Sequence, residues 1–358
     1  MYELGVVLGR ETAEFQIKPT TSRDVVEVES KTPLDLGGLM RVLGGTVKAG
    51  EVEMDTSLNE VEDRLVNLLS LDKSKKVFAI NAIGLGVDGE RLSGQVKKEL
   101  AKRGVASRYV VLKTPLESAV AKQKNYIELV IYKTDMGIVV GRIGAWQDID
   151  DWSARDTIRP GIDAKRGMLP PKLARMMINA AFPEALNEEM VVYDPFCGSG
   201  TVLTEALELG IKGVGSDILA KAVVDTSQNI TVSGVEPGRW RVFASDAAKV
   251  DKSKLDRVDG IVTEPYLGPV DIRGKNIRNI IKGLSKMYIG AFKNLAKLLE
   301  VGRRVVVVTP VYPYKGVKRE IDFVDRCEKF GYTRVAGPFD YHRPQALVQR
   351  QIFVLEKK

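Results

Sequence analysis

The chain of 358 residues is long enough for two or three domains, and its composition, 44% hydrophobic and 28% charged, is that of an ordinary globular protein. No apolar run approaches the roughly 18 residues that a membrane-spanning helix needs, and the first residues lack the basic and apolar regions of a signal peptide. Two cysteines and one histidine exclude a disulfide framework, a zinc site and a conventional hydrolytic triad, and they favour a reducing, cytoplasmic location.

The net charge of +7 is unevenly distributed along the chain. Residues 1–150 carry 21 Lys and Arg against 22 Asp and Glu, whereas the remainder carries 33 against 25. Residues 97–142 are also locally basic, with 10 cations against 4 anions. This excess suits a polyanionic partner such as nucleic acid, although an ordinary lysine-rich surface explains the charge alone equally well.

The N-terminal part of the chain predicts two small α+β regions. Residues 1–55 alternate apolar and polar residues in short stretches, including 2–7, which favours strands and leaves little room for a first helix. Residues 56–145 begin with a helical pattern and then predict this order: strand 77–82, helix 92–103, strand 107–112, short helix 115–122, strands 127–132 and 137–143.

A segment rich in Gly, Asp, Arg and Pro at 146–170 predicts a linker to a C-terminal domain at 171–358. That domain opens with a predicted helix at 171–181. Its most informative stretch is 190–206, which indicates a buried strand, a tight turn with Gly198 and Gly200, and a second helix. The remaining pattern predicts a basic helix at 276–299, a strand at 304–308, a helix at 317–330 and strands at 332–336 and 349–355.

Four successive predicted strands of this domain end in polar or acidic residues. The first is followed by the glycine turn after Asp194, the second ends at Asp217, the third at Asp246 and the fourth at Thr263 and Glu264. Parallel strands of an open α/β sheet present ligand sites at their carboxyl ends, so these side chains are expected at one edge. A single acidic strand end is more often a helix cap, but four in series favour a ligand site.

The turn does not fit a phosphate-containing ligand. It lacks the third glycine of a dinucleotide motif and the Gly-Lys-Ser/Thr of a phosphate-binding loop. Asp194 would repel a pyrophosphate but suits a cationic ligand. S-adenosylmethionine, which carries a sulfonium, an ammonium and no phosphate, therefore fits better than NAD or ATP.

The segment 194–201, Asp-Pro-Phe-Cys-Gly-Ser-Gly-Thr, resembles the S-adenosylmethionine turn of RNA methyltransferases that act on guanine exocyclic amines. Segments 43–48, 155–160 and 167–174 are similar to the THUMP-domain tRNA guanosine methyltransferases that modify position 10. The resemblance implies an N-terminal ferredoxin-like and THUMP region followed by a Rossmann-like class I methyltransferase domain. It also implies a tRNA substrate, and some relatives are thought to work with a small activating subunit.

The resemblance assigns roles to the residues at the strand ends. Asp194 would hold the methionine end of the cofactor, Gly198 and Gly200 would allow close backbone approach, Asp217 would accept from the ribose hydroxyls and Asp246 from the adenine amine. The full predicted cofactor set is Asp194, Phe196, Gly198, Gly200, Thr201, Asp217, Ile218, Asp246 and Ala247. Predicted phosphate contacts, which position an RNA without reading its sequence, are Lys97, Lys98, Lys102, Arg103, Arg108, Lys113, Lys122, Lys124, Lys165 and Arg166.

The acceptor loop of amine methyltransferases reads Asp/Asn-Pro-Pro-aromatic, and this chain departs from that pattern with Thr263, Glu264, Pro265 and Tyr266. An aromatic amine is a poor nucleophile, so acceptors must hold its hydrogens while the ring of the flipped base stacks on the aromatic residue. Glu264 as the acceptor and Tyr266 as the stacking face is the first interpretation. The alternative places Thr263 in the acceptor position.

Three functions remain open at this level. The first is methylation of the guanosine 2-amino group in tRNA; the second is methylation of another RNA or of an adenine amine; the third is RNA binding by an inactive methyltransferase fold. Cys197 lies in the cofactor turn and Cys327 on a late helix, so neither is placed as a nucleophile for pyrimidine methylation. No metal centre is expected.

Overall fold

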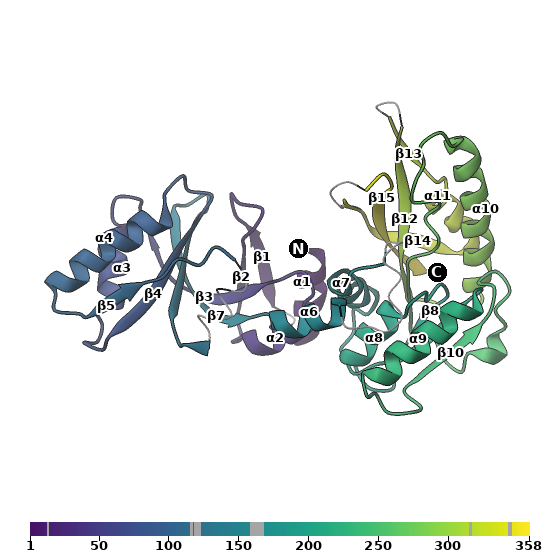
Figure 1. The fold of residues 1–358 in the computed structure, drawn as a ribbon, viewed down its shortest axis with the longest axis horizontal. Coiled ribbons are helices and arrows are strands. Elements are labelled where there is room, and N and C mark those ends of the chain that lie inside the picture. The colour runs from purple at the N-terminus through teal and green to yellow at the C-terminus, as the bar shows by residue number, and fades with distance from the viewer. Residues whose placement is uncertain (13, 115–116, 118–122, 158–167, 315–316, 343–345) are drawn as a thin grey trace. The chain divides into compact units, whose positions relative to one another are not determined.

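The computed structural model of the chain describes residues 1–12, 14–114, 117, 123–157, 168–314, 317–342 and 346–358 (Figure 1). It divides into two compact units, Glu3–Ser153 and Ala154–Lys358. Among the described residues no helix is both long and apolar enough to cross a membrane.

The first unit begins with a small subdomain. It contains α1 (Tyr2–Glu11), a hairpin of β1 (Phe15–Pro19) and β2 (Val26–Ser30), and α2 (Leu36–Val42). The expectation of strand at 2–7 and no first helix is wrong, because Val7 and Leu8 pack as one face of a helix against Leu39 and Leu43. The carboxylate of Glu3 accepts from the backbone N–H groups of the two glycines that follow Leu43, at 2.8 and 2.9 Å.

A five-stranded sheet forms the rest of this unit, in the order β3-β7-β6-β4-β5. Leu65, Val96 and Leu100 of its two helices pack against Phe78 and Leu129 of the sheet. Strand β3 pairs with β7, so this sheet extends across the boundary expected at residue 55. The elements are β3 (Lys48–Thr56), α3 (Val61–Leu69), β4 (Lys76–Ile83), α4 (Gly89–Lys102), β5 (Ser107–Tyr109), β6 (Ile127–Lys133) and β7 (Ile138–Trp146).

The expected linker at 146–170 contains α6 (Ile149–Thr157), so part of it is regular structure. Residues 158–167 of that linker, and most of the short helix expected at 115–122, lie outside the described residues.

The second unit is a largely parallel sheet of eight strands, in the order β10-β9-β8-β11-β12-β15-β14, with β13 paired to β12. Strand order reverses between β8 and β11, which is the position where open α/β sheets bind ligands. The strands are β8 (Val191–Asp194), β9 (Lys212–Asp217), β10 (Trp240–Ala244), β11 (Gly260–Thr263), β12 (Arg304–Tyr314), β13 (Val317–Glu320), β14 (Tyr332–Tyr341) and β15 (Gln349–Lys357). The predicted α/β class is confirmed.

Side chains alternate between the two faces of this sheet, as the period of a strand requires. In β12, Val305 and Val307 join one core cluster, whereas Val306 and Val308 join the other. The first cluster also contains α10 (Ile277–Leu295), and the second contains α7 (Pro171–Ala181), α8 (Thr201–Glu208) and Ile230 of α9 (Ala220–Val232). Helices therefore contribute to the core on both sides of the sheet.

One region differs from the predicted order. Residues 317–330 were expected to form a helix, but β12 extends to Tyr314 and pairs with β13, leaving only α11 (Val324–Cys327) and a 3₁₀ turn (Glu328–Phe330). The strand is favoured because Val311 and Tyr312 continue the extended, buried pattern of β12 beyond the predicted end at residue 308.

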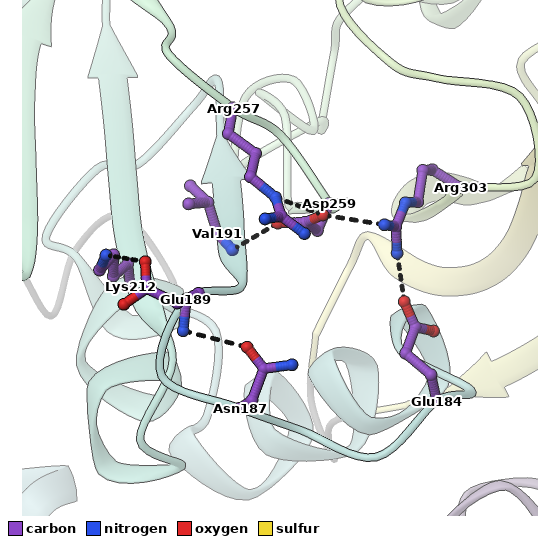
Figure 2. A network of polar contacts seen from close by, with 8 residues as sticks. All are labelled: Glu184, Asn187, Glu189, Val191, Lys212, Arg257, Asp259 and Arg303. Atoms are coloured by element: carbon purple, nitrogen blue, oxygen red, sulfur yellow. Dashed lines mark hydrogen bonds and ion pairs between the residues drawn. The ribbon is translucent and has the colours of Figure 1, made fainter.

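An ionic network joins the amino-terminal ends of β8 and β11, opposite the ligand edge (Figure 2). The carboxylate of Asp259, which is 3% exposed, accepts from the backbone N–H of Val191 at 2.9 Å and pairs with Arg257 and Arg303 at 2.7 and 3.0 Å. Arg303 also pairs with Glu184. The two central strands are thus fastened to each other at this end.

Candidate active site at the carboxyl edge of the sheet

The turn after β8 depends on two glycines in left-handed conformations. Gly198 has φ +54° and Gly200 has φ +85°, which L-residues adopt at a cost. The backbone N–H of Gly200 donates to the carbonyl of Cys197 at 2.7 Å. A Cβ at Gly200 would lie 2.7 Å from the Cγ2 of Thr226, so the turn has no space for a larger residue.

Helix α9 fixes this turn from outside. The Thr226 hydroxyl donates to the carbonyl of Gly198 and the Asn229 amide to that of Ser199, both at 2.8 Å. These two side chains share one face of the helix, since they are three residues apart. Cys197 packs beneath the turn with 5% exposure, and burial raises the pKa of its thiol, which agrees with a packing role.

Asp194 ends β8 and is almost fully buried, with 2% exposure. Its Oδ1 accepts from the backbone N–H of Phe196 at 3.0 Å and from the hydroxyl of Thr263 at 2.7 Å. Burial raises the pKa of this carboxyl to about 7, against the lowering effect of these two hydrogen bonds; the charges of Asp217 and Glu264 raise it further. A cation bound beside Asp194 would favour its ionised form.

The next two carboxylates follow along the same edge, as expected. Asp217 ends β9 and accepts from the backbone N–H of Gly198 at 3.1 Å, so it supports the turn directly. Asp246 follows β10, accepts from the N–H of Ala248 at 2.9 Å and keeps 38% of its side chain exposed. Because β10, β9, β8 and β11 are consecutive parallel neighbours, the prediction that four strand ends share one edge is confirmed.

The remaining predicted cofactor residues surround these carboxylates. Phe196 is half-buried, Thr201 begins α8, Ile218 is 68% exposed directly after β9, and Ala247 is buried after Asp246. Their contacts to a cofactor stay predictions.

The structure gives each candidate acceptor in the loop after β11 a protein partner. The Thr263 side chain is fully buried and binds Asp194, which ties the acceptor loop to the cofactor turn. The Glu264 carboxylate accepts from the Nε of Arg350 at 2.6 Å, and both side chains are nearly buried. Which of the two holds the substrate amine therefore stays open.

The end of this loop is positioned by β12. Pro265 is buried, whereas Tyr266 is 59% exposed and presents a ring that a base could stack on. The hydroxyl of Tyr312 donates to the carbonyl of Leu267. Gly268 has φ +89°, and a Cβ there would collide with the Tyr312 hydroxyl, so the loop requires glycine at this position.

Sequence reasoning missed Arg350 and Tyr312. Arg350 lies between Gln349 and Gln351 at the start of β15 and is 6% exposed, and an arginine that opens an otherwise apolar strand is the available signal. Tyr312 lay beyond the predicted end of its strand. Both act on the acceptor loop from strands that are distant in the chain.

A buried ionic cluster joins α6 and α7 to α8. Glu205 of α8 is fully buried and accepts from Arg155 of α6 at 2.9 Å and from Arg175 of α7 at 2.7 Å. Met168 approaches the cofactor turn, because the Ser199 hydroxyl donates to its sulfur at 3.3 Å. These contacts bring Arg155 and Met168, from the second and third of the segments that resemble the tRNA methyltransferases, to α8 and the cofactor turn.

The predicted RNA-contacting cations that the structure describes all lie exposed in the first unit: Lys97, Lys98, Lys102, Arg103, Arg108, Lys113 and Lys124. Three have partners already. Lys102 pairs with Glu99 at 2.6 Å, Arg103 donates to Asn67 at 2.6 Å and Arg108 to Tyr126 at 3.3 Å. Lys122, Lys165 and Arg166 lie outside the described residues.

The residues at the edge suit a cationic, phosphate-free cofactor. Three carboxylates, Asp194, Asp217 and Asp246, face a site with no lysine or arginine among the predicted cofactor residues. Carboxylates accept from ammonium and hydroxyl groups and repel phosphate. In the described part of the chain no group of three or more His, Cys, Asp or Glu side chains could hold a metal ion.

Comparison with known proteins supports this interpretation. The crystal structure of TrmN from Thermus thermophilus has the same fold, with a TM-score of 0.51 at 18% identity over 93% of this chain and 91% of that one. A family model described as DNA methylase matches residues 101–228, which include the cofactor turn. The fold and the carboxylates at the carboxyl edge of the sheet together define a Rossmann-like methyltransferase architecture.

Two relatives specify the family. A tRNA (guanine(10)-N2)-dimethyltransferase of Methanothermobacter thermautotrophicus is 39% identical over 103 residues, 28% of each chain. A protein of Methanothermococcus thermolithotrophicus named "Probable tRNA (guanine(10)-N2)-dimethyltransferase" is 34% identical over 119 residues, 32% of this chain and 70% of that relative. The chain belongs to the tRNA (guanine(10)-N2)-dimethyltransferase family. Its match spans 28% to 50% of the length of the first three curated relatives.

Proposed function

We propose that this chain transfers a methyl group from S-adenosylmethionine to the exocyclic 2-amino group of a guanosine in tRNA, at position 10. The observation that carries the proposal is the hydrogen bond between Asp194 and Thr263, which joins the cofactor turn to the acceptor loop across the switch point of the sheet. The names of the family members supply the substrate class.

The cofactor would lie along the three carboxylates. Asp194 would face its ammonium end, Asp217 its ribose hydroxyls and Asp246 its adenine amine, with Gly198 and Gly200 allowing close backbone approach. When bound, the cofactor supplies a methyl group on a positively charged sulfur.

The acceptor loop would position the guanine. Glu264, oriented by Arg350, accepts a hydrogen of the 2-amino group, and the exposed ring of Tyr266 stacks on the flipped base. Hydrogen bonds from the amine to fixed acceptors direct the nitrogen lone pair at the methyl group. Such positioning supplies much of the rate enhancement of a catalysed reaction.

In the first unit, we propose that the sheet with α3 and α4 acts as the THUMP region and the subdomain before it as the ferredoxin-like unit. The exposed cations of this region, Lys97 and Lys98 of α4 among them, would contact tRNA phosphates. With a tRNA substrate, we also propose a cytoplasmic location.

The test is methyl transfer from labelled S-adenosylmethionine to an unmodified tRNA transcript, followed by nucleoside digestion. A matched transcript carries inosine at position 10, which differs from guanosine only in lacking the 2-amino group. The proposal expects methylated guanosine with the first transcript and none with the second. Methylated guanosine from the inosine transcript would refute the proposed position, whereas methylated adenosine would favour methylation of an adenine amine, the chemistry that the DNA methylase match keeps open.

The same assay separates the other open alternatives. Transfer by this chain alone excludes an obligatory activating subunit. Tight tRNA binding and cofactor binding without transfer, even when methyltransferase-deficient cell extract is added as a source of partner, would indicate an RNA-binding protein that retains the fold.

A further inference from the structure

The helix that follows the acceptor loop carries an unusual run of charge. Residues 272–299 contain seven cations and no acidic residue. Five of these cations form what we call the basic stripe, and all five are exposed: Lys275, Arg278, Lys282, Lys286 and Lys293.

Helical geometry places this stripe on one side of α10. Lys275 directly precedes the N-cap of α10, and within the helix the steps of four, four and seven residues from Arg278 to Lys293 return to the same face at 3.6 residues per turn. The opposite face is apolar and packed, with Ile277, Tyr288 and Phe292 buried in the core on that side of the sheet. The stripe from Arg278 to Lys293 extends roughly 22 Å at 1.5 Å per residue.

The charge of the stripe is not neutralised by the protein. Within the described residues, Arg278, Lys282 and Lys286 form no ion pair, whereas the nearby Arg273 is bound to Asp271 at 2.7 Å. Uncompensated cations at this density repel each other, which is a cost unless a polyanion binds them.

At its amino-terminal end the stripe borders a hollow of about 560 Å³ between α10 and the β13 strand. Lys275 and Arg278 line it from one side and Arg319 of β13 from the other. Three cations from two elements that are separated in the chain thus converge on one concave surface.

The helix that carries the stripe contacts the acceptor loop through its opposite, apolar face. A Cβ at Gly268 would lie 3.3 Å from Ile280 and 3.4 Å from Leu284, so α10 packs directly against the loop that follows Tyr266. A polyanion bound along the stripe would therefore lie across α10 from this loop, one helix diameter of roughly 10 Å away.

We propose that the basic stripe and Arg319 form a phosphate-binding track on the second unit, which holds the RNA backbone across α10 from the acceptor loop. This rests on the proposed function for the nature of the polyanion. RNA is favoured over an anionic membrane surface because the apolar face of α10 is buried in the core and cannot insert into lipid.

The experiment removes three charges from the stripe, with Arg278→Gln, Lys282→Gln and Lys286→Gln combined in one variant of the full chain. The matched control removes three exposed cations elsewhere on the same unit, Lys252→Gln, Lys254→Gln and Lys329→Gln. Binding of an unmodified tRNA transcript is measured at several salt concentrations, together with S-adenosylmethionine binding and the melting temperature.

We expect the stripe variant to bind tRNA on the order of tenfold more weakly at moderate salt, and the slope of log K against log salt to decrease by roughly 2 to 3, since each phosphate contact contributes about 0.7 to 0.9. Cofactor affinity should stay at the wild-type value, and the melting temperature should not fall, because the substitutions relieve repulsion between cations. The control variant should bind tRNA within about twofold of the wild type, because non-specific charge loss alone has a small effect.

Equal tRNA affinities and salt slopes in the two variants would overturn the proposal. So would unchanged tRNA binding with lost binding to phosphatidylserine vesicles, which would identify a membrane surface instead. These outcomes differ from a failure of the proposed function. In that case the wild type would transfer no methyl group, while tRNA binding would still depend on the stripe.

Discussion

Asp194→Asn is expected to stabilise the cofactor-free protein while abolishing cofactor binding. Burial raises the pKa of the Asp194 carboxyl to about 7, so between pH 4 and 7 the folded state holds a proton that the unfolded chain releases. The free energy of unfolding therefore falls as pH rises through this range. The asparagine Oδ1 can still accept from Thr263 and Phe196, so the substitution removes the cost of the charge and keeps both hydrogen bonds.

The expected size follows from the two pKa values. With a pKa of about 3.9 in the unfolded chain, the carboxyl costs roughly 2 kcal/mol at pH 5.5 and roughly 4 kcal/mol at pH 8. The variant should accordingly exceed the wild type in the free energy of unfolding by about 2 kcal/mol more at pH 8 than at pH 5.5.

The assay is urea-dependent hydrogen exchange, followed in peptides that cover β8 and β11, so that the second unit is measured by itself. Asp246→Asn is the control, because it makes the same chemical change at a carboxylate with 38% of its side chain exposed. An advantage of Asp194→Asn that is the same at both pH values would refute the reasoning, as would a variant less stable than the wild type at pH 8.

Three further substitutions test the loop and the turn. Arg350→Gln should leave S-adenosylmethionine binding intact, lower kcat strongly and reduce the free energy of unfolding by roughly 3 kcal/mol, because the nearly buried Glu264 carboxylate loses its cationic partner. Arg350→Lys should restore part of kcat. Full activity in Arg350→Gln would contradict a positioning role for Arg350. Gly268→Ala should keep cofactor affinity and lose methyl transfer, because its Cβ would displace the acceptor loop. Gly290→Ala is the control, since a Cβ there meets nothing closer than 3.7 Å. Gly200→Ala should weaken cofactor binding and lower the free energy of unfolding by about 1 to 3 kcal/mol, since the residue needs φ +85° and the new Cβ would meet Thr226. A melting temperature equal to that of the wild type would contradict this prediction.

The second unit could be predicted from sequence in most of its elements because its signals are local. A short apolar strand, two glycines and a helix at 190–206 define the turn whatever surrounds it, and the order of strand ends follows from parallel topology. The ends of helices and strands were less certain. The sequence favours a strand at 2–7 because Tyr2–Glu11 is short and has no side-chain cap at its start, so that only packing against α2 shows which residues form the buried face of a helix.

The residues of the candidate site likewise fall into those that the sequence predicts and those that it does not. Asp194, Asp217 and Asp246 could be placed because each follows its own strand directly. Arg350 could not be assigned to Glu264, nor Tyr312 to Leu267, because these pairs are joined by sheet pairing across 86 and 45 residues of chain. The raised pKa of Asp194 likewise comes from burial, which composition and spacing do not reveal.

The network around Asp259 has a consequence for how distant substitutions would act. Strands β8 and β11 have only four residues each, so their two ends are roughly 13 Å apart. Asp259 binds them together at one end, and the Asp194–Thr263 hydrogen bond does so at the other. Loss of Asp259 would permit a register slip, and a slip of one residue turns each side chain to the opposite face. Such a change would carry Thr263 away from Asp194 without altering any residue that contacts a ligand.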